Sequence, residues 1–150
     1  MDTREVLENM LNSYSEPGDA ERFVGLCEDI IDVPGIISKR LFWDNRKKTL
    51  LRAVVMYFIE TRAGHISLDM IADMLRQLPV SRDGEFKDPL REHFRHYADM
   101  HPESPAVREY MIFDSRALKI RYAAMTCLSS VFDELINESS QEEDLFCYEK

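Results

Sequence analysis

A chain of 150 residues with a net charge of −9 and three cysteines fits one ordinary domain, able to bury a core without disulfide bonds. This charge excludes a non-specific polyanion binder, since such affinity comes mainly from neutralising phosphates, so any contact with DNA must be local. The N-terminus is unlike a signal peptide and no apolar run reaches about 18 residues, which predicts a cytoplasmic chain that does not itself span a membrane.

The charge is distributed unevenly along the chain. Residues 1–32 carry nine acids and two bases, and residues 133–150 carry seven acids and one base. This leaves a net charge of +4 for residues 33–132. An anion-binding site is therefore expected in the mildly basic middle of the chain.

Helix signals recur along the chain and predict an all-α fold. We expect a compact bundle of about six to seven helices over residues 1–138, followed by a mobile acidic tail over residues 139–150. The first helix is capped by Asp2, and the second begins near Asp19 and ends before Pro34.

The third predicted helix carries the clearest apolar stripe. It follows Trp43 and runs to about Arg62, where Gly64 suits a left-handed residue that ends it. Trp43 begins the stripe and is expected in the core. Cys27 and Cys127 fall within apolar helical patterns, so we interpret both as small core residues.

Capping residues also place the remaining helices. Ser67 begins the fourth helix, residues 79–87 form a polar loop, and Asp88 and Ser104 each precede a proline that opens a helix. The last long helix starts at about Ser115. The core positions expected on the last two helices are apolar and follow helical spacing: Val107, Tyr110, Met111, Leu118, Met125, Leu128, Val131, Phe132 and Leu135.

Residues 42–60 join the pair Phe42–Trp43, a basic turn and an apolar-faced helix. This segment resembles the tryptophan-bearing helix of the all-helical domain in type IV coupling proteins, the TraG/TraD-type ATPases that deliver DNA to conjugation and type IV secretion machines. Four further segments resemble the same domain in the same order: residues 20–31, 67–75, 101–110 and 118–130. Together the resemblance covers about residues 19–132.

The resemblance implies a substrate-recognition domain without its motor. In that family the domain is thought to receive a relaxase, a relaxosome accessory protein or DNA for transfer, and the parent ATPase is hexameric and anchored in the membrane. This chain has no Gly-x-x-x-x-Gly-Lys-Ser/Thr loop. We therefore expect a monomeric, non-enzymatic domain with no cofactor and no metal, whose partners are a relaxase or accessory protein and single-stranded DNA.

The expected binding residues are the bases between Lys39 and Arg52, at and just before the third helix, and those of the turn before the last helix. Lys48 and Arg52 lie four apart on one flank, where both are expected to remain in water. Where relatives often carry Gly-Lys-Thr-Arg, residues 118–121 read Leu-Lys-Ile-Arg, which keeps the two bases but adds apolar bulk. The candidates for contact with DNA or a protein partner are Lys39, Arg40, Arg46, Lys47, Lys48, Arg52, Lys119 and Arg121.

Other interpretations of the same residues remain open. The basic run could be a solvated helix face that offsets the acidic N-terminal region, and the chain could be a free-standing helical adaptor or regulator that binds a basic protein partner. A zinc site at His93, His96 and His101 is disfavoured, because the third histidine lies beyond the end of the predicted helix. An acid–base site at the same histidines is disfavoured, because the sequence offers no nucleophile or phosphate-binding loop for it to serve.

Overall fold

The computed structural model describes residues 2–33 and 42–148, with side chains as far as residue 138. The all-α prediction is confirmed, because the described part consists mainly of helices with one short β-hairpin. The elements are α1 (Thr3–Ser13), a 3₁₀ turn η1 (Pro17–Asp19), α2 (Ala20–Ile30), α4 (Asn45–Glu60), α5 (Leu68–Leu75), β1 (Val80–Arg82), β2 (Glu85–Lys87), α6 (Pro89–Met100), α7 (Pro105–Asp114) and α8 (Leu118–Tyr148).

Four predicted helix starts are confirmed by their caps. The side chains of Asp2, Ser67, Asp88 and Ser104 each accept a hydrogen bond from the backbone N–H three residues later, over 2.8 to 3.3 Å. These bonds satisfy N–H groups that have no partner within the helix, which explains why such local signals predict helix starts well.

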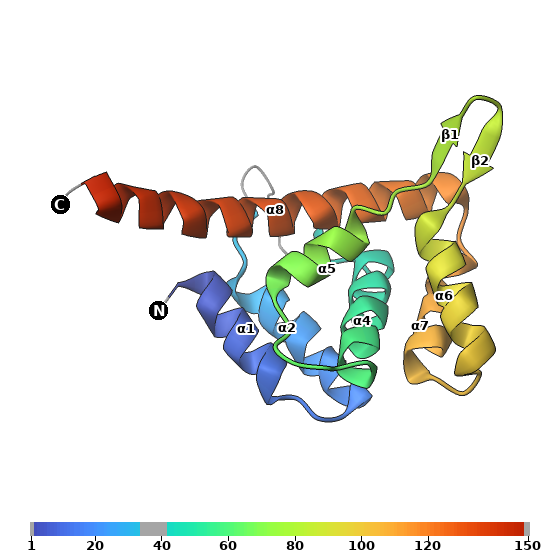
Figure 1. Cartoon of the computed structure of the whole chain (residues 1–150), viewed down its shortest axis with the longest axis horizontal. Coiled ribbons are helices and arrows are strands. Elements are labelled where there is room, and N and C mark those ends of the chain that lie inside the picture. The colour runs from blue at the N-terminus through green and yellow to red at the C-terminus, as the bar shows by residue number, and fades with distance from the viewer. Residues whose placement is uncertain (1, 34–41, 149–150) are drawn as a thin grey trace.

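Helix α8 runs along one side of the molecule, and the other helices lie beside it (Figure 1). Helix α4 packs against α2 and α7, whereas α5 packs against α8. The hairpin lies near the N-terminal end of α8, and the opposite end of α8 extends past α1 (Figure 1). None of the helices in the described ranges is long and apolar enough to cross a bilayer.

Aromatic side chains fill the core, as the helical spacing predicts. Trp43 is 1% exposed, which confirms its predicted burial. Phe94 stacks on Tyr110 with ring centroids 4.2 Å apart, which joins α6 to α7. Cys27 is also buried as predicted, and burial raises the pKa of its thiol well above the ordinary value.

Two predictions about glycine and loop structure are wrong. Residues 79–87 contain an antiparallel hairpin in which Ser81 pairs with Phe86, whereas a polar loop was expected. Asp83 and Gly84 form its turn with φ of 54° and 78°. Positive φ at both central residues is the geometry of a tight hairpin turn, which Asp-Gly favours. Gly64, expected in the left-handed region, does not adopt it.

Several positions on the last helices are more exposed than expected. Leu118, Met111 and Cys127 all face solvent, whereas most of the other predicted core residues of α7 and α8 are buried. The backbone of α8 continues to Tyr148, and the side chains of the predicted acidic tail lie outside those described.

Candidate protein-docking surface

The bases on the flank of α4 are bound by acids from neighbouring helices. Arg52 Nε donates to Glu109 Oε1 at 2.8 Å, and Lys48 Nζ lies 3.0 Å from Glu28 Oε2. The Arg52 side chain is only 19% exposed, so the expectation that it remains in water is wrong. These ion pairs join α4 to α2 and α7, and a phosphate would have to displace them.

Lys47 is also engaged within the chain. Its ammonium donates to the Phe42 carbonyl at 2.8 Å and to Asp44 Oδ2 at 3.2 Å, and lies 4.7 Å from the Phe42 ring centroid. Burial opposes ionisation of Asp44, but hydrogen bonds from the Lys47 backbone and side chain outweigh it and lower the pKa of Asp44. Lys47 therefore stabilises the start of α4.

Arg121 lies in a buried cluster of charges between α6, α7 and α8. Its side chain is 3% exposed, and its Nη1 donates to Asp88 Oδ2 at 2.8 Å. Arg91 Nε donates to Asp114 Oδ1 at 2.7 Å. This hydrogen bond raises the pKa of Arg91, because its effect is larger than the opposing effect of burial. Tyr110 donates to the same oxygen at 3.3 Å, and burial raises the pKa of its phenol far above the ordinary range.

The remaining candidates divide into exposed and undescribed residues. Arg46 and Lys119 are exposed, whereas Lys39 and Arg40 lie outside the described residues. Of the six candidates that the structure describes, Arg46 and Lys119 form no ion pair with another described residue, whereas the other four do. A role in binding stays a prediction for all eight.

The buried pair Arg121–Asp88 also positions the hairpin. Asp88 directly follows β2 and caps α6, while Arg121 belongs to the first turn of α8. Their ion pair therefore holds the base of the hairpin beside the start of α8. Lys119 lies two residues before Arg121, about 200° around the helix axis, and so reaches solvent where Arg121 is buried.

An apolar hollow lies between the hairpin and the first turns of α8, which we call the hairpin–α8 hollow. Its volume is about 440 Å³ and its lining residues are Pro79, Ser81, Phe86, Leu118, Lys119 and Tyr122. Three of its large side chains are unusually exposed for apolar groups: Phe86 at 51%, Leu118 at 42% and Tyr122 at 46%. Such clustered exposure is a property of interaction sites.

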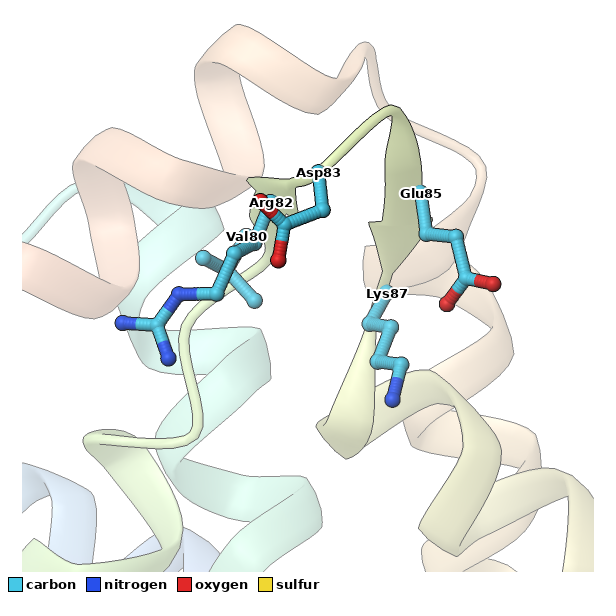
Figure 2. A pocket seen from close by; sticks show the side chains of 5 residues that line it. All are labelled: Val80, Arg82, Asp83, Glu85 and Lys87. Atoms are coloured by element: carbon cyan, nitrogen blue, oxygen red, sulfur yellow. The ribbon is translucent and has the colours of Figure 1, made fainter.

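The opposite face of the hairpin has a different character. A second hollow of about 340 Å³ is lined by Val80, Arg82, Asp83, Glu85 and Lys87. Figure 2 shows that all five side chains belong to the hairpin itself. Two bases and two acids share this face, so it offers neither one sign of charge nor an apolar surface.

The half-buried carboxylate of Glu60 serves the fold. Its Oε2 accepts hydrogen bonds from Tyr97 at 2.9 Å and Ser104 at 2.6 Å, and its Oε1 accepts from the backbone N–H of Ala106 at 3.0 Å. These bonds fasten the end of α4 to the start of α7. Within residues 2–33 and 42–138, no group of three or more metal-ligating side chains is suited to hold an ion.

Compared with protein-family models, curated proteins and solved structures, the chain gives no match. The resemblance to coupling-protein recognition domains therefore rests on the residues quoted for it.

One dipeptide in the sequence is a signal for the hairpin of this surface. Asp83-Gly84 is a strong hairpin dipeptide, but the flanking strands have only three residues each and are largely polar. Leu118 and Tyr122 match the helical apolar spacing of α8, so nothing local distinguishes them from core residues. Only the position of the hairpin reveals that both side chains line an open hollow.

Proposed function

We propose that this chain is a protein-recognition module of the coupling-protein type, which docks a relaxase or a relaxosome accessory protein through the hairpin–α8 hollow. The observation that carries this proposal is the exposed apolar trio Phe86, Leu118 and Tyr122 beside the single base Lys119. Aromatic side chains at the centre of a patch and charge at its margin are typical of protein interfaces.

Protein cargo fits this surface better than DNA does. Binding to phosphates requires free bases, and Lys47, Lys48, Arg52 and Arg121 are held by acids of the same chain. The net charge of −9 also repels a polyanion. The resemblance allows for contact with DNA, but the geometry supports a hydrophobic contact with a protein.

The test is a titration of the fluorescently labelled chain with three probes: a relaxase, an accessory protein and single-stranded DNA. Each titration is run at about 50 and 200 mM salt, because phosphate contacts weaken steeply across that range. We expect binding to a protein probe with weak salt dependence, and no comparable affinity for DNA.

Phe86→Ser tests the surface itself. Loss of an aromatic anchor at an interface typically costs about 2 kcal/mol, so affinity for the protein probe should fall roughly 30-fold. Met100→Ser is the matched control, because Met100 is 68% exposed on α6 and does not line the hollow. Equal affinity of wild type and Phe86→Ser would refute this docking site, as would salt-sensitive DNA binding lost on charge reversal at Lys48 and Arg52.

A further inference from the structure

The charge that borders the hairpin–α8 hollow has one sign. Lys119 is the one charged residue among the six that line it, and it is exposed. Residues 115–132, which contain the start of α8, include three bases and no acid. Arg121 is held by Asp88, whereas Arg116 and Lys119 form no ion pair with another described residue. The base beside the apolar lining is therefore uncompensated, although the whole chain carries −9.

The acids of the hairpin do not neutralise this base. Ser81 pairs with Phe86 in the strand register, and both residues line the hollow. Neighbouring residues of a strand point to opposite faces. Glu85 accordingly lies on the opposite side of the hairpin, and Asp83 of the turn lines that side too, where two bases accompany them (Figure 2).

The N-terminus of α8 adds to the positive charge. A helix N-terminus carries a partial positive charge, and at α1, α5, α6 and α7 an Asp or Ser side chain accepts from its free N–H groups. The residue before α8 is Ala117, whose side chain has no acceptor. Such a terminus does not select a ligand by itself, but here Leu118 and Lys119 of the same turn line the apolar hollow. An acid docked there would meet both the Lys119 ammonium and the helix N-terminus.

We propose that the docked protein enters the hairpin–α8 hollow with a short segment that carries an apolar side chain beside a carboxylate. The apolar group contacts the exposed trio Phe86, Leu118 and Tyr122. The carboxylate pairs with Lys119 at the start of α8. This inference rests on the proposed function, because it specifies the chemistry of the segment that the docking protein presents. A segment with a base in the same place would be repelled by Lys119 and Arg116.

The size of the hollow favours one short segment over a broad surface. Its volume of about 440 Å³ lies within the range of about 300–1,000 Å³ that single ligand pockets span. Such a space suits the side chains of one peptide segment. The apolar lining supplies most of the affinity and the single base supplies the choice between partners, since charge complementarity affects specificity more than affinity.

Chemical-shift titration of the isotope-labelled whole chain with model peptides tests the charge preference. The probes are acetyl-Glu-Leu-Phe-amide and its Gln and Lys counterparts, each also made with the variable residue last. An exposed ion pair and a helix N-terminus each contribute modestly, so the acidic peptide should bind roughly fivefold more tightly than the Gln peptide, with the Lys peptide weakest. The preference should shrink between about 50 and 200 mM salt, because salt screens exposed charges.

Charge reversal at Lys119 is the decisive variant. Lys119→Glu should reverse the order, so that the Lys peptide binds most tightly. Arg95→Glu is the control, because it makes the same charge change at an exposed position on α6, and it should leave the order unchanged. Four results would overturn the inference: equal binding of the three peptides, no binding of any, a preference that survives Lys119→Glu, and tighter binding of octanoate, an apolar carboxylate without a peptide backbone.

Titration with a protein partner separates this inference from the proposed function. If a relaxase or accessory protein binds, and Phe86→Ser weakens binding while Lys119→Glu does not, docking in the hollow stands and the acidic segment is wrong. If the peptides show the Lys119-dependent preference but Phe86→Ser leaves binding of the protein unchanged, the hollow selects acidic segments and the proposed docking of that protein fails.

Discussion

Replacing Arg121 by methionine should destabilise the fold, because Arg121 is part of a buried charge cluster. Methionine keeps much of the side-chain length but removes the charge that lies 2.8 Å from Asp88 Oδ2. Removing one partner of a buried ion pair costs about 3–5 kcal/mol, because the other charge is left uncompensated. Arg91 Nε, 3.7 Å from Asp88, partly compensates, so we expect a value of about 3 kcal/mol, near the lower limit.

The assay is urea unfolding followed by circular dichroism, with thermal melting as a second readout. A loss of about 3 kcal/mol should lower the melting temperature by roughly 6–12 °C in a chain of this size. Adding Asp88→Asn should recover much of the loss, because asparagine removes the stranded charge yet still caps α6. Lys119→Met, an exposed control two residues away, should change stability by under about 0.5 kcal/mol. Arg121→Met unfolding within 1 kcal/mol of wild type would refute the structural role, and Arg121 would again be a candidate for binding.

Three further predictions concern other parts of the fold. Glu60→Ala leaves Tyr97 of α6 and two donors at the start of α7 without their acceptor, and should cost about 2–3 kcal/mol in urea unfolding. A loss under about 0.5 kcal/mol would contradict this role. Gly84→Ala must hold an alanine at φ of 78° and should cost about 1–2 kcal/mol, so an unchanged melting temperature would contradict the turn. Burial, and to a smaller extent His96, lowers the pKa of His93 below its ordinary value of 6.5. Just below that pH the unfolded chain therefore binds more protons than the folded chain, so the free energy of unfolding falls as the pH drops through about 6.5. His93→Gln should reduce the slope of melting temperature against pH between 5 and 7.5, and an identical slope would show that His93 does not contribute.

Local chemistry explains which parts of the fold could be predicted from sequence. The caps at Asp2, Ser67, Asp88 and Ser104 involve residues three positions apart, so the sequence around each carries the whole signal. The burial of Trp43 followed from its place at the head of an apolar stripe. Both kinds of inference need no knowledge of distant contacts.

The binding residues could not be predicted in the same way. Arg121 and Lys119 look equivalent in the sequence, yet Arg121 is buried and Lys119 is exposed. The difference is that Asp88, 33 residues before Arg121, pairs with Arg121 and not with Lys119. Arg52 likewise pairs with Glu109, 57 residues later. A sequence pattern can locate bases on a helix, but distant acids decide which bases are free to bind.

Amide chemical-shift mapping during titration with a relaxase or accessory protein tests the proposed docking surface most directly. We predict that the largest shift changes fall on Phe86, Leu118, Lys119 and Tyr122. Changes confined to the flank of α4 around Lys48 and Arg52, with the hairpin unaffected, would contradict the assignment of the hairpin–α8 hollow as the docking surface.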